Sequence, residues 1–266
     1  MSDALEKKKL HATWVGVMVL ALLPALLGQR QGKKAASPAS AAAMPVPFSV
    51  GETLHYQVLW SEFLVHAGTL DFSIPEQRNF FGRLVWHFRA NAHTINTTRT
   101  IYPLDDQFDS YSDAAELRGI QYELYLNEEG KSENSIYRMT TQSEPAPPDA
   151  TLVRVLPGTR DPIGLIYALR AVDWQQTPEF RVPAFDGHRA YEIRADVEIP
   201  SGHVSVAAGQ FEATRIAVHV SERGNLLADT RFWVWLAHNP ARTPVLIEAE
   251  VPFGTARIEL LQLPQH

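Results

Sequence analysis

The sequence contains no cysteine. This absence excludes disulfide bonds, thiolate metal sites, a cysteine nucleophile and the lipid-modified cysteine that anchors a bacterial lipoprotein. Lysine is scarce as well, because only Lys131 follows Lys34. Together with a formal net charge of −6 and no basic run after Lys34, this composition argues against nucleic acid as a partner.

The motifs that mark common enzyme classes are also missing. No GxSxG turn, HExxH pair, glycine-rich dinucleotide fingerprint or phosphate-binding loop occurs in the chain. His87 and His93 fall on one face of an expected strand, but six residues of extended chain separate them by about 20 Å, too far to share one ion. The sequence therefore predicts no cofactor and no metal. We interpret the two histidines as part of a polar strand face or of a polar pocket wall.

Residues 1–28 have the layout of an export segment. Three lysines at positions 7–9 precede the almost purely apolar stretch from Thr13 to Gly28, which is the order found in secretory signal peptides. The stretch is short for a membrane span, so residues 10–28 are either part of a cleaved signal peptide or an anchor in the inner membrane. Residues 29–47 are small, polar and proline-bearing, and they predict a flexible linker. Both alternatives place the following domain in the periplasm or outside the cell.

The rest of the chain alternates apolar and polar residues with a period of two, which is typical of β-strands. Short turns rich in glycine and asparagine divide the runs and imply antiparallel neighbours. An apolar fraction of 45% is enough to build a core. These features predict one all-β domain over residues 48–264, with one or two short helices. A large antiparallel meander of this kind must curl or close, so we expect a strongly curved sheet or an open barrel.

One stretch, residues 161–171, breaks the alternation and predicts a helix. Asp161 is suited to cap it, because its carboxylate can accept hydrogen bonds from the free N–H groups of the first turn. Pro162 suits the first helical position, and apolar residues follow with a period of 3.6. We predict that this helix plugs the concave side of the sheet and that Arg170 reaches a carboxylate or carbonyl at the rim. The residues expected to be buried are Leu165, Ile166 and Leu169.

Four acidic residues are candidates for chemistry. Asp105, Asp106 and Asp109 lie close together after a proline, and Glu123 falls on the next expected strand. Paired carboxylates can serve general acid–base catalysis or bind Ca²⁺, although the DxDxDG pattern of a calcium loop is absent. A hydrolase would need two of them within about 5–10 Å of each other across a cleft. The competing interpretation is a solvated turn.

Aromatic residues suggest a binding surface. Trp233, Trp235 and Arg231 are expected on one face of a strand, with Phe232 on the other. Rows of tryptophan form either a core layer or a platform on which sugars and acyl chains stack, and both alternatives stay open. Further rings can line a site between sheet and helix. The predicted ligand-binding set consists of Trp233, Trp235, Arg231, Tyr167, Trp60 and Trp86.

Several motifs follow one another in an order that resembles a known family. The pattern F-x-V-G-E-x-L-x-Y-x-V-x-W runs from Phe48 to Trp60, and Ala67–Gly68 follows on the second strand. DPIGLIYALR occupies residues 161–170, and Pro252–Gly254 precede the last strand. Together they resemble the bacterial domain of unknown function 3108 family over residues 48–263. The resemblance implies an exported envelope protein with a large β-domain and no established activity, and it assigns no catalytic residue.

These observations favour a non-catalytic binding or carrier-like module for a lipidic or glycan ligand, or for a protein partner in the envelope. The alternative is a carboxylate-dependent hydrolase that acts on envelope glycan or lipid. A third hypothesis is a structural partner in a membrane-associated complex, which broad apolar patches on the outer sheet face would favour. Membrane contact is expected through the amino-terminal segment if that segment stays uncleaved.

Overall fold

The computed structural model describes residues 45–60, 65–142, 147–227, 231–251 and 254–263. The predicted export segment and most of the predicted linker lie outside these residues. The two helices are α3 (Asn96–Ile101) and α4 (Pro162–Ala171). The strands are β1 (Thr53–Trp60), β2 (Val65–Phe80), β3 (Arg83–Thr94), β4 (Asp105–Asp113), β5 (Gly119–Glu128), β6 (Lys131–Thr140), β7 (Thr151–Arg154), β8 (Glu179–Phe185), β9 (Ala190–Val206), β10 (Gly209–Glu222), β11 (Asn225–Leu226), β12 (Arg231–Ala237), β13 (Pro244–Val251) and β14 (Gly254–Leu260).

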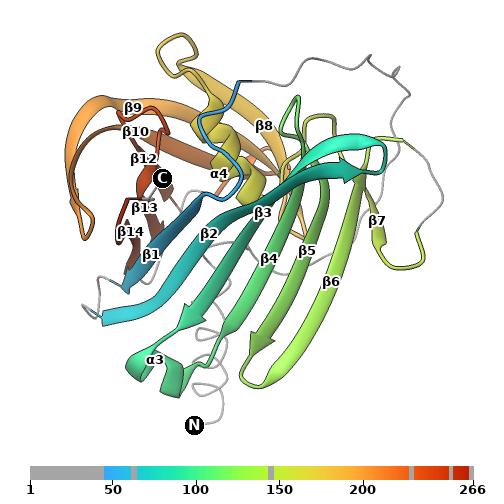
Figure 1. The fold of residues 1–266 in the computed structure, drawn as a ribbon, viewed down its shortest axis with the longest axis horizontal. Helices are drawn as coiled ribbons and strands as arrows, with labels where there is room; N and C mark the ends of the chain where they lie inside the picture. Colours follow the sequence, from blue (N-terminus) through green and yellow to red (C-terminus); the bar gives the residue numbers. More distant parts are fainter. Residues whose placement is uncertain (1–44, 61–64, 143–146, 228–230, 252–253, 264–266) are drawn as a thin grey trace.

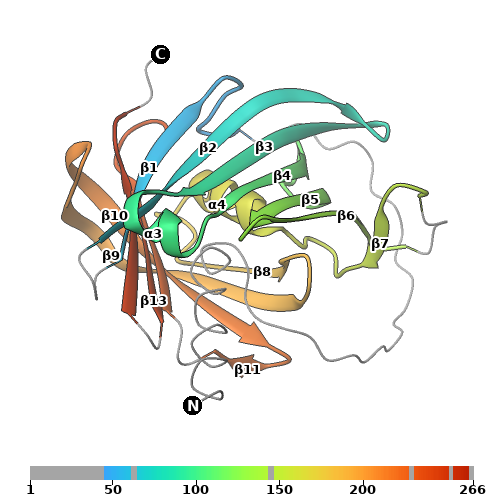
Figure 2. The same ribbon diagram turned by 90° about the horizontal axis from the view of Figure 1, so that it is seen from below.

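These strands form one sheet of fourteen strands that curls round without closing (Figures 1 and 2). The order along the sheet is β7-β6-β5-β4-β3-β2-β1-β14-β13-β12-β10-β9-β8, with β11 paired to β10. The first and last strands therefore pair in the middle, and β7 and β8 are the two edges. Apart from the parallel pair β6–β7, the neighbouring strands are antiparallel. The expected all-β class, meander and strong curvature are confirmed.

A short extended segment links two strands that are not neighbours in the sheet. The backbone N–H of Gly119 at the start of β5 donates to the carbonyl of Thr159 at 2.8 Å. The next residue, Arg160, exchanges backbone hydrogen bonds with Pro183 (3.0 Å) and Phe185 (2.9 Å) on β8. The segment thus connects the two halves of the open sheet at one end and leads directly into α4.

Helix α4 lies in the concavity of the sheet, as predicted (Figure 2). The Asp161 carboxylate accepts from the Gly164 N–H at 2.8 Å, and Pro162 begins the helix. At the other end the Arg242 guanidinium donates to the last helical carbonyls, the shortest contact being 2.7 Å to Val172. Side-chain caps at both ends satisfy backbone groups that a helix this short would leave free. Among the described residues, no helix is long and apolar enough to cross a bilayer.

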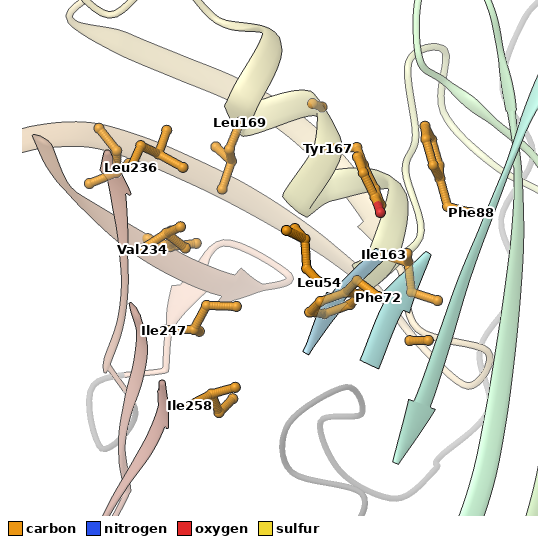
Figure 3. Close-up of a cluster of buried hydrophobic side chains, with 14 of the residues drawn as sticks. Leu54, Phe72, Phe88, Ile163, Tyr167, Leu169, Val234, Leu236, Ile247 and Ile258 are labelled. Atoms are coloured by element: carbon orange, nitrogen blue, oxygen red, sulfur yellow. The ribbon is translucent and has the colours of Figure 1, made fainter. Parts of the chain in front are cut away.

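The face that α4 buries differs in part from the prediction. Leu169 is fully buried, but Leu165 and Ile166 are only half-buried. The sheet wraps around the part of the apolar stripe that holds Ile163 and Tyr167, which point into the core (Figure 3), and it covers Leu165 and Ile166 only in part. The Tyr167 ring stacks on Phe88 of β3, with centroids 3.9 Å apart. Figure 3 also shows Leu169 on the side of the cluster that holds Val234 and Leu236 of β12.

Arg170 fulfils its predicted role. Its guanidinium is fully buried and forms two hydrogen bonds with the Glu52 carboxylate, at 2.6 and 2.8 Å. It also donates to the Ala241 carbonyl at 3.0 Å. A buried, two-pronged arginine–carboxylate pair is a strong and geometrically specific contact. It ties the helix to the start of β1 and to the β12–β13 loop.

Residues that usually interrupt strands lie inside two strands of this sheet, and each has a structural reason. Pro75 lies within β2, where the ladder with β3 shifts register between Ser73 and Glu76. The shift is a bulge, where a proline needs no ladder partner. Strand β9 likewise continues through Ser201 and Gly202. A Cβ on Gly202 would lie 3.2 Å from the Trp235 ring, so this glycine is there for close approach. Helix α3 had no counterpart in the sequence pattern.

Candidate functional site: the inner face of the sheet and its open end

Two of the predicted ligand-binding residues lie in the core beside α4. Trp86 stacks on Phe88 with centroids 6.2 Å apart, and Phe88 stacks on Tyr167. Phe48 closes the stack edge-on, 5.1 Å from the Tyr167 ring. All of these rings are buried. The structure therefore places Trp86 and Tyr167 in a packed aromatic layer that holds the helix against β3.

Three other predicted residues lie on the outer face of the sheet. The Arg215 guanidinium lies 4.4 Å from the ring centroid of Trp233 and 5.5 Å from that of Trp235. The Trp235 indole N–H also donates to Glu248 at 2.9 Å. Arg231 is exposed, and its guanidinium lies 3.7 Å from the Glu250 carboxylate. The two tryptophans thus belong to a row of ion pairs and cation–π contacts across β10, β12 and β13.

Trp60, the sixth predicted residue, lies on the inner face at the end of the strands far from α4. It packs with Ala67, Ala249 and Ala256, and half-buried Phe232 packs against this cluster. The six predicted residues therefore do not converge on one site. Three of them occupy the outer face, two the core beside α4, and one the opposite end of the inner face.

The inner face carries a row of apolar side chains that are only half-buried, and we call this row the inner rim. The register places these side chains on the inner face, because paired residues point to the same side of a sheet. Val58 pairs with Ile258 and Ala92 pairs with Asp106, and both partners point inward. Helix α4 packs against β3, β4 and β8 at the other end of the strands. The period-two alternation of the sequence predicted part of this arrangement, since it placed Phe232 on the face of its strand opposite Trp233. The inner rim consists of Val58, Ala92, Leu126 and Phe232.

The candidate acidic residues separate onto the two faces of β4. On the outer face Asp109 is 1% exposed and accepts from His87 Nε2 (2.5 Å), Arg89 Nε (2.7 Å) and Gln107 Nε2 (2.6 Å). Burial alone would raise the pKa of Asp109, but these three donors hold it below its usual range. The carboxylate is ionised, and its hydrogen bonds with His87 and Arg89 tie β4 to β3.

Glu123 lies directly across the ladder from Asp109. It accepts from the Gln121 amide and from the Tyr125 hydroxyl, the latter at 2.6 Å. Gln121 in turn accepts from Arg138 Nε at 2.9 Å. Asp109 and Glu123 are thus brought together, as the hydrolase hypothesis required, but inside a hydrogen-bond network that uses both carboxylates. Such a network stabilises the outer face of the sheet.

Asp105 sits at the edge of the same outer face. It forms a two-pronged pair with Arg99 of α3, at 2.8 and 2.6 Å, and accepts from His93 at 2.9 Å. The Arg99 guanidinium lowers the pKa of Asp105 to about 2. Both histidines that we singled out, His87 and His93, therefore pair with aspartates. Among the described residues, no three metal-ligating side chains come close enough to hold an ion.

Asp106 points to the inner face, where it faces Glu128. Asp106 Oδ1 accepts from the Asn127 N–H at 2.8 Å, and the Tyr102 hydroxyl donates to Glu128. The other oxygens, Asp106 Oδ2 and Glu128 Oε1, are buried without a partner. Burial raises the pKa of Asp106 to about 7, and the neighbouring Glu128 carboxylate adds to the shift. A proton shared between the two carboxyl groups accounts for both oxygens.

Comparisons with known proteins bear on the whole domain. The sequence profile of a family described as "Protein of unknown function (DUF3108)" matches residues 55–261. The chain belongs to this family. The match confirms the resemblance drawn from the motifs, and it brings no activity to the DUF3108 chain. No curated protein matches the sequence.

Solved structures with a similar course of the chain are distant in sequence. A β-barrel-like protein of domain of unknown function DUF1849 from Brucella abortus is 12% identical, with a TM-score of 0.49, over 80% of this chain and 97% of that one. A protein provisionally assigned as exported, with a YmcC-like fold, from Bacteroides fragilis is 10% identical, with a TM-score of 0.38, over 85% and 100%. A protein provisionally assigned as a lipoprotein from Parabacteroides distasonis is 9% identical, with a TM-score of 0.37, over 84% and 99%.

Proposed function

We propose that this DUF3108 chain is an exported envelope protein that binds a lipidic ligand, without catalysis, on the inner face of its curled sheet. The observation that carries the proposal is the inner rim. Four apolar side chains from β1, β3, β5 and β12 line one concave face and are only half-buried. Apolar surface that converges on a concave face from several strands is typical of sites for apolar ligands.

The energetics of an acyl chain suit such a surface. Each methylene group removed from water contributes about 0.8 kcal/mol. Ten methylene groups laid along the rim would therefore contribute about 8 kcal/mol before the costs of immobilisation are subtracted. A flat glycan has far less apolar area to bury, and the tryptophan pair that would stack on one is covered by Arg215. The rim therefore favours the lipidic ligand over the glycan.

The rim also offers one polar feature. Asp106 pairs across the ladder with Ala92 of the rim, and its Oδ2 is buried without a partner. Glu128 Oε1 lies beside it in the same condition. In the unliganded chain these two oxygens share a proton, and a hydroxyl or ammonium group that replaced the shared proton would donate to the same oxygens. The ligand chemistry that fits both features is an amphiphile with an acyl chain and a donor-bearing head group.

The proposed location is the periplasmic side of the inner membrane or beyond it. The lysines at positions 7–9 followed by the apolar stretch to Gly28 support export. A chain without cysteine cannot be a cysteine-anchored lipoprotein. Membrane association must then come from the amino-terminal segment or from the domain itself.

A reloading experiment tests the proposal. The full chain is delipidated, incubated with a C16 acyl amine and measured by native mass spectrometry. We expect one bound molecule per chain. In Leu126→Gln, which makes the rim polar, affinity should fall at least tenfold, or about 1.4 kcal/mol. The adjacent residue Asn127 is exposed, so Asn127→Gln is the matched control and should bind like the parent. Equal binding by the two variants, or no uptake by the parent, would contradict the proposal.

A further inference from the structure

The turn between β2 and β3 has an unusual sequence for its conformation. Phe80 pairs with Arg83, so Phe81 and Gly82 alone form the loop. Both have positive φ, 50° for Phe81 and 71° for Gly82, which is the pattern of a type I′ turn. Asparagine, aspartate and glycine favour the first of these positions, and a bulky side chain there is a true outlier. Phenylalanine at Phe81 works against the local backbone.

The same turn exposes apolar surface. Phe81 is 56% and Leu84 is 49% exposed. The Phe81 ring packs beside Phe80, with centroids 4.1 Å apart, but more than half of the side chain remains in water. Both views show the turn at the periphery of the molecule (Figures 1 and 2). A disfavoured backbone conformation that presents this much apolar surface to solvent points to a role in binding.

Cationic groups surround the turn. The Arg138 guanidinium lies 3.3 Å from the centroid of the Phe81 ring. Arg83 is half-exposed, and its nearest carboxylate, Asp113, is 3.8 Å away. Arg78 lies over the Phe80 ring at 5.0 Å. The turn thus presents the apolar side chains of Phe81 and Leu84 with arginines close behind them. This order matches the boundary between the acyl chains and the anionic head groups of a bilayer.

The chain also enters the domain close to this turn. Phe48, which follows the predicted linker, packs against Trp86 with centroids 5.3 Å apart. Trp86 is only two residues from Leu84 along β3, about 7 Å.

We infer that the turn from Phe81 to Leu84 inserts into the surface of an anionic lipid bilayer, as a second membrane contact beside the amino-terminal segment. A bilayer is favoured over a protein partner because two side chains bury far less than the roughly 800 Å² per partner of a stable protein interface. Weak lipid contacts become firm when two signals act together. The inference stands on the turn alone and does not depend on the proposed ligand.

The absence of cysteine makes a direct test possible, since one introduced cysteine can be labelled uniquely. The full chain is incorporated into vesicles of phosphatidylethanolamine and phosphatidylglycerol, with a polarity-sensitive fluorophore at Leu84→Cys. The control is Leu226→Cys, because Leu226 is 56% exposed, close to the 49% of Leu84, but lies on β11, which pairs with β10. We expect nitroxide lipids to quench the Leu84 label at least about twofold more than the Leu226 label.

A further variant separates insertion from folding. Phe81→Asn fits the left-handed conformation and should leave the melting temperature unchanged or slightly raised. In this background the excess quenching at Leu84→Cys should fall by at least about half. Equal quenching at both labelled positions, or full quenching of the Leu84 label in Phe81→Asn, would overturn the inference.

Discussion

Asp106 and Asp109 lie three residues apart on β4, yet their environments are opposite. Asp109 faces outward, accepts three hydrogen bonds and has a lowered pKa. Asp106 faces inward, lies between apolar neighbours and has a pKa raised to about 7. The difference shows that one strand serves two purposes. Its outer face holds a closed polar network, whereas its inner face belongs to a concave apolar surface with a carboxyl pair that shares a proton.

The largest expected effect comes from breaking the outer network. Asp109→Asn keeps the size of the side chain but removes the charge that His87 and Arg89 share. Because both partners are at least partly buried, the loss should cost about 3–5 kcal/mol of unfolding free energy. Urea denaturation measures it. A cost below about 1 kcal/mol would mean that the network is solvent-screened rather than structural.

The inner face should respond to loss of volume. Leu169→Ala removes a fully buried side chain of α4 and should cost about 2–5 kcal/mol. Ile166 is half-buried, so Ile166→Ala on the same helix is the control and should cost about 1 kcal/mol. Equal and small shifts in the urea midpoints of both variants would show that α4 is a mobile lid instead of a plug.

The pH dependence of stability separates the two faces by sign. In the folded chain Asp106 holds its proton up to about pH 7, against a usual value of 3.8. Its contribution is therefore fully present below about pH 4 and is lost as the pH rises towards 7. The unfolding free energy of Asp106→Asn, relative to that of the parent, should therefore rise by on the order of 2–4 kcal/mol between pH 4 and pH 8.

Asp105→Asn provides the opposite sign on the outer edge. The pKa of Asp105 is lowered to about 2, so its contribution is present above about pH 4 and is lost only below that. The difference between this variant and the parent should stay flat from pH 4 to pH 8. Chemical denaturation at several pH values measures both variants, and a flat profile for Asp106→Asn would refute the shared proton.

The sequence predicted much of this architecture, because period-two alternation and turn residues are local signals. Helix α4 and its Asp161 cap followed from local chemistry alone. The identity of the Arg170 partner did not, since Glu52 is far away in the sequence, and the partial exposure of Leu165 and Ile166 depends on how the sheet wraps around the helix. The places of Pro75 and Gly202 inside strands could not be predicted, because bulges and close contacts are tertiary features.

The candidate site was harder to predict, because it depends on which strands curl together. Alternation placed Trp233 and Phe232 on opposite faces, but it could not say which face is concave. Glu128 lies next to a hairpin turn, where a glutamate is usually solvated. The register between β4 and β5 brings it beside Asp106, and the Tyr102 hydroxyl donates to it.

The most direct test of ligand binding on the inner face uses Phe232 and Trp233, two neighbouring residues of β12. Phe232 belongs to the inner rim, while Trp233 lies on the outer face under Arg215. Affinity for a fluorescent C16 acyl amine is measured by equilibrium titration of the delipidated full chain. We predict that Phe232→Ser binds at least about tenfold more weakly, whereas Trp233→Ser binds like the parent. Weaker binding by Trp233→Ser with unchanged binding by Phe232→Ser would contradict it and place the ligand on the outer face.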